Sequence, residues 1–201
     1  MVSAVEIVAA AKCGIAAARQ MSGWRRVQHF RDGLALLLAV WVPERRRALV
    51  GISLRDIDME ASTIRFSPDR MKTGESRIRL LPSELAPLLA EYITLRGVQT
   101  HDALLIGKGG RPLGGAAFYA AACRTTERYM GRRLPPHFFR NGVAIALVEA
   151  DPNRPDLAQV ALGHRSATTT NHYTESATSI AACRHLTSSI SQAGSKARQR
   201  L

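Results

Sequence analysis

The 201-residue chain carries 28 Lys and Arg residues against 16 Asp and Glu residues, a net charge of +12, and 46% of its residues are hydrophobic. This apolar fraction supports a folded core and argues against an intrinsically disordered chain. The longest apolar run, residues 34–42, is far shorter than the roughly 20 residues that span a membrane. The positive excess favours a polyanionic partner, with nucleic acid the first candidate and an anionic membrane surface the second.

The first half of the chain predicts helices followed by a small sheet. Residues 3–20 are rich in alanine and predict a helix, and apolar residues at helical spacing predict another over residues 27–42. Pro43 ends that helix, and residues 44–53 are expected to form the next one. Residues 63–66 and 77–80 alternate apolar and polar side chains, and with residues 54–58 they predict an antiparallel sheet of about three strands.

The second half of the chain predicts helices only. We expect them over residues 83–96, 115–131, 136–150, 156–162, 167–173 and 176–190, with a glycine-rich loop at 97–114. The predicted fold class is therefore mainly α with one small three-stranded antiparallel sheet.

Cysteine usage and the N-terminus both indicate a cytoplasmic protein. Cys13, Cys123 and Cys183 are widely spaced and form no Cys-x-x-Cys pair, so we expect reduced, buried thiols and neither a zinc site nor a disulfide framework. Glu6 and Lys12 interrupt the pattern of a secretory signal peptide.

Six residues of types suited to phosphate chemistry occur in a fixed order along the chain. An arginine opens the helix after Pro43, a lysine lies on the predicted hairpin, and a His-x-x-Arg pair shares one helix face. A Leu-Gly-His element then precedes a tyrosine by nine residues. The residues are Arg45, Lys72, His137, Arg140, His164 and Tyr173.

This set resembles the tyrosine recombinases, also called phage integrases, whose pattern has the same six elements in the same order. The flanking residues 36–38, 54–58 and 72–74 are similar to family members as well, and the resemblance covers about residues 27–187. It implies the tyrosine recombinase catalytic-domain fold of DNA breaking-rejoining enzymes. It also implies a site-specific recombinase or integrase that cuts and rejoins DNA through a 3′-phosphotyrosine intermediate, without metal or ATP.

Each of the six residues has a physical role in that chemistry. Positioned cations stabilise the charge that develops on a phosphodiester under attack, so Arg45 and Arg140 would clamp the scissile phosphate, with His164 as a further donor. Tyr173 would be the nucleophile, and His137 is the candidate base that removes its proton. Lys72 would protonate the leaving 5′-hydroxyl.

The first arginine of the pattern falls within a run of three, residues 45–47. Register with Leu49 and residues 56–58 selects Arg45 and leaves the other two as solvated side chains or phosphate contacts. Family members often carry Glu three residues after this arginine and His after the second arginine, where this chain has Ala48 and Asn141.

A metal-dependent alternative rests on three carboxylates. Asp56, Asp58 and Glu60 alternate along a predicted strand and could mimic a nuclease or transposase site. A solvated strand face explains them more simply, because no further carboxylate motif completes the set. We therefore expect neither a metal nor a cofactor.

Full-length members of the family carry a separate N-terminal DNA-binding domain, whereas about 26 residues precede the resembling region here. We expect an N-terminal helical extension over residues 1–26, the catalytic domain over 27–190 and a basic flexible tail over 191–201. The chain is then either an isolated catalytic domain or a naturally short recombinase. Two other functions stay open: DNA relaxation like that of type IB topoisomerases, and a non-catalytic DNA-binding remnant.

The expected partners are double-stranded DNA, further copies of the chain that form dimers or tetramers on DNA, and an accessory directionality factor, with no membrane partner. The expected location is the cytoplasm, in association with the nucleoid. The helix after Tyr173 either passes to a neighbouring protomer or packs on its own domain through residues 180–186.

Overall fold

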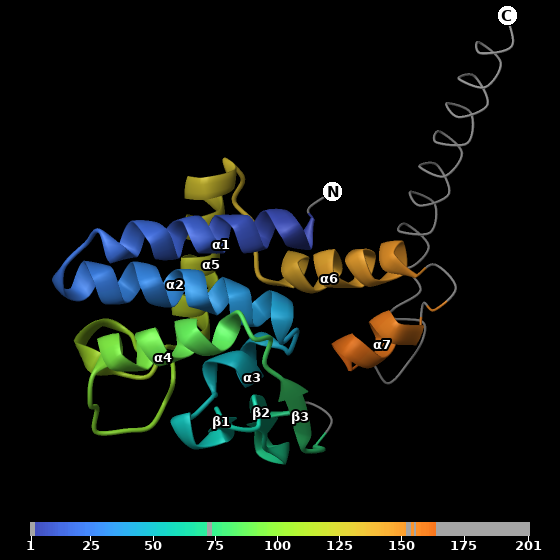
Figure 1. Cartoon of the computed structure of the whole chain (residues 1–201), viewed down its shortest axis with the longest axis horizontal. Coiled ribbons are helices and arrows are strands. Elements are labelled where there is room, and N and C mark those ends of the chain that lie inside the picture. Colours follow the sequence, from blue (N-terminus) through green and yellow to red (C-terminus); the bar gives the residue numbers. More distant parts are fainter. Residues whose placement is uncertain (1–2, 72–73, 152–153, 155, 164–201) are drawn as a thin grey trace, which may run out of the picture. The chain divides into compact units, whose positions relative to one another are not determined.

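The computed structural model describes residues 3–71, 74–151, 154 and 156–163, and the chain divides into two compact units, residues 1–140 and 141–201. The expected helices at 167–173 and 176–190 and the expected tail lie outside the described residues. The fold class is confirmed, since the described chain is mainly helical with one three-stranded antiparallel sheet (Figure 1). Its elements are α1 (Ala4–Arg19), α2 (Gly23–Trp41), α3 (Arg46–Val50), β1 (Ile57–Asp58), β2 (Thr63–Phe66), β3 (Arg77–Leu80), α4 (Leu85–Arg96), α5 (Gly115–Met130), α6 (His137–Ala150) and α7 (Asp156–Leu162).

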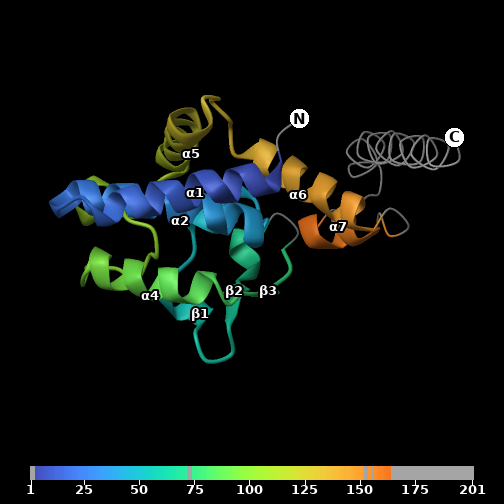
Figure 2. The ribbon, with the colours of Figure 1, turned by 45° about the horizontal axis from the view of Figure 1, so that its top comes forward.

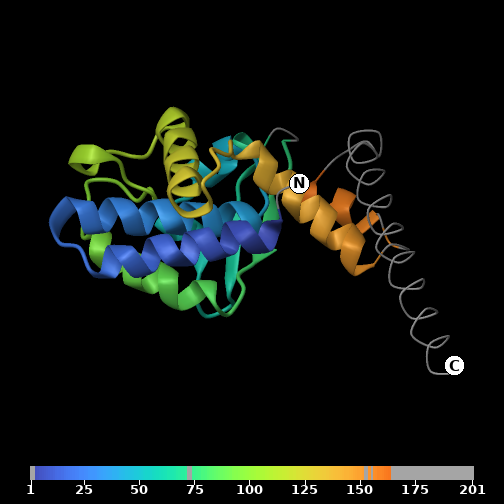
Figure 3. The ribbon, with the colours of Figure 1, turned by 90° about the horizontal axis from the view of Figure 1, so that it is seen from above.

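Helices α1 and α2 form an antiparallel pair at the centre of the first unit (Figure 3). A capping box starts α1: the Ser3 hydroxyl accepts from the Val5 amide at 3.1 Å, and the Glu6 carboxylate accepts from the Ser3 amide at 2.9 Å. The buried residues of α1 are mostly small, namely Ile7, Ala10, Ala11, Gly14, Ile15 and Ala18. Small side chains let the two helix backbones approach closely, and Gly33 of α2 lies at such a contact.

Helix α2 is the core of the first unit. Residues 30–40 are all buried, which is the pattern of a helix covered on every side. Figure 2 shows α5 and α4 on opposite sides of the α1–α2 pair. The helix predicted over residues 27–42 is therefore confirmed, although it begins earlier, at Gly23.

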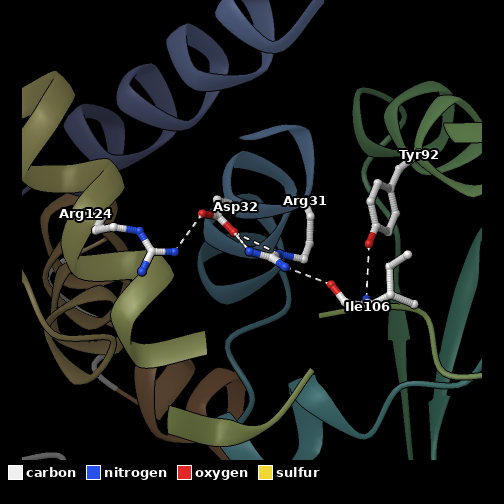
Figure 4. Close-up of polar contacts among 5 residues, drawn as sticks. All are labelled: Arg31, Asp32, Tyr92, Ile106 and Arg124. Atoms are coloured by element: carbon white, nitrogen blue, oxygen red, sulfur yellow. Dashed lines mark hydrogen bonds and ion pairs between the residues drawn. The ribbon is translucent and has the colours of Figure 1, made fainter. Parts of the chain in front are cut away.

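A buried polar network joins α2 to the elements around it (Figure 4). The Arg31 Nε donates to Asp32 Oδ1 at 2.8 Å, and its Nη1 donates to the Ile106 carbonyl at 2.8 Å. Asp32 also pairs with Arg124 of α5 at 3.3 Å, and the Tyr92 hydroxyl of α4 accepts from the Ile106 amide at 3.2 Å. The side chains of Arg31 and Asp32 are 5% and 9% exposed, so each charge depends on the other for compensation.

The sheet has the order β1-β2-β3, with both pairs of strands antiparallel. Ile64 and Phe66 of β2 are buried and fix which face of the sheet turns inward. Ile64 pairs with Arg79 and Phe66 pairs with Arg77, so these two arginines lie on the same inward face.

Strand β3 therefore reverses the usual pattern of burial, in which apolar side chains face inward and charged side chains face solvent. Its apolar residues Ile78 and Leu80 are 60% and 76% exposed, whereas the side chains of Arg77 and Arg79 are only 23% and 18% exposed. A shift of one residue in register would exchange the two faces. The positive charges of these two arginines therefore require a negative group on the inner side of the sheet.

The second unit is described from Asn141 to Gly163, with gaps, and has its own small apolar cluster. The C-terminal turns of α6 pack against α7 through Ala144, Val148, Ala158 and Leu162. Helix α7 ends at Leu162, and the φ of +61° at the following Gly163 is the left-handed conformation that favours glycine after a helix.

Two expectations need correction. The helix expected over 44–53 is only Arg46–Val50, because residue 45 has extended backbone and Ser53 caps a separate short turn, its amide donating to Asp56 Oδ2 at 2.7 Å. Cys13 is exposed on α1 rather than buried, while Cys123 is buried as expected and Cys183 lies outside the described residues. Within the described part of the chain, every helix is too short or too polar to cross a membrane.

Candidate active site

A cavity of roughly 370 Å³ opens in the first unit and contains three of the six candidate residues. Residues at the end of α2, in α3, at the start of α5 and in the first turn of α6 surround it. Its lining is Ala39, Glu44, Arg45, Arg46, Leu49, Phe118, Tyr119, Pro136, His137 and Arg140. Segments nearly 100 residues apart in the chain thus bring Arg45, His137 and Arg140 to one cavity.

Two of the three consecutive arginines, Arg45 and Arg46, line the cavity. Arg45 is half-buried and has extended backbone (φ −65°, ψ 149°) immediately before α3. Arg46 is exposed at this lining, whereas Arg47 is exposed and donates to the Asp69 carbonyl at 3.5 Å. Arg45 also lies close enough to Arg140 to disfavour the charged form of that residue.

Arg140 is held in place by the chain that precedes Arg45. Its Nη1 donates to the backbone carbonyl of Pro43, so the second arginine is anchored beside the first. Burial and the positive charge of Arg45 lower the pKa of Arg140 to about 10, and the Glu44 carboxylate opposes this shift. The guanidinium stays charged at neutral pH, and an anion bound in the cavity would relieve the unfavourable burial and repulsion.

His137 begins α6 and is exposed at the mouth of the cavity. Because it stands three residues before Arg140, both side chains lie on one face of the helix. Its ring lies 4.4 Å from that of Phe138, centroid to centroid. An exposed imidazole that lines the same cavity as two arginines is accessible to a group that enters the cavity.

A charge cluster that no sequence motif indicated lies beside the candidate residues. It consists of Glu44, Arg77 and Arg79. The Glu44 side chain is 1% exposed and accepts from Arg77 Nη1 at 3.1 Å, from Arg79 Nε at 2.9 Å and from Arg79 Nη2 at 2.8 Å. Two signals could have revealed this cluster: a single acid before three consecutive arginines, and two arginines on one face of a strand. Four arginines around one carboxylate leave the cavity region strongly positive.

Lys72, His164 and Tyr173 lie outside the described residues, so their positions in the site remain predictions. Two of the three carboxylates of the metal-dependent alternative are engaged with backbone: Asp56 accepts from the Ser53 amide at 2.7 Å, and Asp58 accepts from the Ala61 amide at 2.8 Å. Among the described residues, no group of three or more His, Cys, Asp or Glu side chains could hold a metal ion.

Comparisons of sequence identify relatives over most of the chain. The model of the phage integrase family matches residues 15–179. The tyrosine recombinase XerC of Roseiflexus sp. (strain RS-1) is 28% identical over 154 residues, which are 73% of this chain and 48% of the relative. XerC of Azotobacter vinelandii is 28% identical over 158 residues, which are 78% of this chain and 50% of the relative. The chain spans about half the length of the curated relatives that it matches.

Comparisons of structure give the same fold. The XerA recombinase matches with a TM-score of 0.69 and 19% identity, over 90% of this chain and 62% of that one. The XerH site-specific recombinase bound to its difH substrate matches with a TM-score of 0.66 and 22% identity, over 85% and 48%. A lambda integrase dimer bound to a COC′ core site matches with a TM-score of 0.55 and 19% identity, over 85% and 45%.

Proposed function

The chain belongs to the phage integrase family, and we propose that it is a site-specific recombinase that cuts and rejoins DNA through a 3′-phosphotyrosine intermediate. The observation that carries this proposal is the cavity that joins Arg45, His137 and Arg140. These are three of the six positions of the family pattern, they come from distant parts of the chain, and the cavity around them is positively charged.

In the proposed cleavage step, the two arginines hold the non-bridging oxygens of one phosphodiester. Each guanidinium presents a fork of donors that suits phosphate, and the charge that builds up during attack strengthens the interaction. The Tyr173 oxygen attacks phosphorus, and its proton passes to His137. A bond forms between the tyrosine and the phosphate, while the bond from phosphorus to the 5′-oxygen breaks.

The leaving 5′-oxygen takes a proton from Lys72, and His164 contributes a further hydrogen bond to the phosphate. The phosphoester is conserved as a 3′-phosphotyrosine, so a 5′-hydroxyl of another strand can attack it and reverse the chemistry. The reaction therefore needs neither ATP nor a metal ion. Residues 27–190 form the catalytic domain in this proposal, between the extension 1–26 and the tail 191–201.

Double-stranded DNA is the proposed substrate, and copies of the chain assemble on it as dimers or tetramers. The net charge of +12 supports DNA binding through phosphates. Among the structural neighbours, XerH is bound to difH substrate and lambda integrase forms a dimer on a core site. Double-stranded breaks are avoided if each copy cuts one strand at a time.

The test is covalent capture on nicked duplex DNA. Binding sites are first selected from a randomised pool of duplexes, and the selected sequences are then nicked so that the 5′-hydroxyl fragment diffuses away after cleavage. Wild-type protein should accumulate a covalent complex that survives denaturing electrophoresis, and Tyr173→Phe should form none.

Each alternative function predicts a different result in these assays. A DNA-binding remnant would retard the selected duplex in a gel without any covalent complex. A topoisomerase-like enzyme would relax supercoiled plasmids that lack the selected site. A covalent complex formed by Tyr173→Phe would refute the assignment of the nucleophile.

A further inference from the structure

The inverted strand β3 needs a partner for its two inward arginines. Arg77 and Arg79 face the interior with Ile64 and Phe66 on the neighbouring strand, while the apolar side chains of β3 face outward. Burial of a guanidinium without a counter-charge is strongly unfavourable. The alternation of β3 alone would favour the opposite face, so the observed register must depend on a group outside the sheet.

Glu44 is that group. One oxygen of its carboxylate accepts from both arginines at 2.8–3.1 Å, with Arg79 contributing two donors from its planar fork. Charge-assisted hydrogen bonds of this length are about twice as strong as neutral ones. The Glu44 carboxylate is also buried, so loss of either side of the cluster removes a counter-charge from the other.

Glu44 lies between the two backbone positions that hold the catalytic arginines. The carbonyl of the preceding residue, Pro43, accepts from Arg140, and the following residue is Arg45 itself. The Glu44 amide donates to the Val42 carbonyl at 2.6 Å, which closes a tight turn at Pro43. A force that displaced Glu44 would therefore move Arg45 and the acceptor of Arg140 together.

We propose that Glu44 is a positioning residue of the recombinase: bound by Arg77 and Arg79, it fixes the segment that places Arg45 and Arg140 around the scissile phosphate. This inference rests on the proposed function and adds a residue to it. The Glu44 side chain is only 1% exposed and is engaged by Arg77 and Arg79, so we assign it no contact with the phosphate. It acts through the two arginines, and its negative charge also moderates the repulsion among the four guanidinium groups.

Glu44→Gln tests the proposal because it keeps the shape of the side chain and removes its charge. We expect the rate of covalent complex formation at saturating nicked DNA to fall about 10- to 100-fold, as when transition-state donors are misplaced. The affinity for the same DNA should be unchanged or higher, because the variant carries one more net positive charge. A purely structural defect would weaken binding and slow cleavage together, and that outcome would overturn the proposal.

A matched control and a double-mutant cycle isolate the contact. Glu91 pairs with Arg19 on the surface of the same unit, at 2.6 Å, so Glu91→Gln makes the same chemical change away from the site and should leave the rate within 2-fold. Arg79→Gln should slow cleavage like Glu44→Gln, and the double variant should be no slower than either single variant. Fully additive effects would show that the two residues act independently and would refute the proposal.

A readout without DNA separates failure of this inference from failure of the proposed function. The Nε–H signal of Arg140 in a nitrogen-15 spectrum of the full chain should shift in Glu44→Gln and stay in place in Glu91→Gln. If wild-type protein forms no covalent complex, the recombinase function fails and this spectrum alone decides whether Glu44 positions Arg140. An Arg140 signal that is unchanged in Glu44→Gln would overturn the inference in either case.

Discussion

Replacement of Gly33 by alanine would place a methyl group against the backbone of α1. The new Cβ would lie 2.8 Å from the carbonyl oxygen of Ala11 and 2.7 Å from Cγ1 of Ile15. Neither distance is tolerated between non-bonded heavy atoms of these types, and a helix carbonyl cannot turn away without breaking its own hydrogen bond. Helices α1 and α2 would have to separate by several tenths of an ångström.

The loss of stability in Gly33→Ala can be estimated by comparison with Gly14, a second glycine on the same pair of helices. Alanine is favoured over glycine inside a helix by about 1 kcal/mol, and this gain applies to both sites. A Cβ at Gly14 would meet Cε2 of Tyr129 at 3.4 Å, which is close to ordinary contact. The difference between the two variants is therefore the steric cost at Gly33, about 2–3 kcal/mol, at the upper part of the range for overpacked cores.

Urea unfolding of both variants measures this difference directly. We expect Gly14→Ala to be as stable as wild type or slightly more stable, and Gly33→Ala to lose about 1–2 kcal/mol after its gain in helix propensity. Each kcal/mol corresponds to a change of about 2–4 °C in Tm for a chain of this length. Equal stabilities for the two variants would refute the close backbone packing of α1 on α2.

Three further predictions concern charged groups of the first unit. Arg140→Lys should slow covalent complex formation about 100-fold or more in the nicked-DNA assay with little loss of DNA affinity, because lysine cannot replace the bidentate fork of arginine. Equal rates for wild type and the variant would exclude Arg140 from the phosphate clamp. Asp32→Asn should lower the free energy of unfolding in urea by about 3 kcal/mol, since it leaves Arg31 buried without a counter-charge, and a loss under 1 kcal/mol would contradict that dependence. Burial, followed by the charge of Arg128, lowers the pKa of His29, so the unfolded chain binds a proton more readily than the folded chain does. The free energy of unfolding should therefore fall as the pH drops from about 7.5 to 5, and His29→Gln should reduce this loss. A variant with the same pH dependence as wild type would refute the assignment to His29.

Much of the fold could be predicted because it depends on local patterns. The large apolar residues of α2 recur at helical spacing in the sequence, and Gly163 follows α7 where a helix terminus favours glycine. The strands at 63–66 and 77–80 were likewise visible from their alternation, whereas the first strand is shorter than the expected 54–58 and covers only Ile57–Asp58. These signals need only neighbouring residues, so one sequence is enough to reveal them.

The features that escaped prediction depend on contacts between distant residues. The alternation of β3 shows a strand but not which face is buried, because that is decided by Glu44, 33 residues before Arg77. For the site, the resemblance of the six-residue pattern to the tyrosine recombinases implied that Arg45, His137 and Arg140 act together, and they line one cavity. The cluster that supports them belongs to no motif.

The charge cluster around Glu44 also constrains how domains of this family can be recombined in the laboratory. A chimera with a relative whose crossover falls between residues 44 and 77 would take the carboxylate from one parent and its two arginines from the other. If the second parent has apolar residues at the positions of Arg77 and Arg79, the hybrid buries the Glu44 carboxylate without the two arginines that it accepts from, at a cost of about 3–5 kcal/mol. A crossover before Pro43 or after Leu80 takes Glu44, Arg77 and Arg79 from the same parent, and hybrids built in this way should fold.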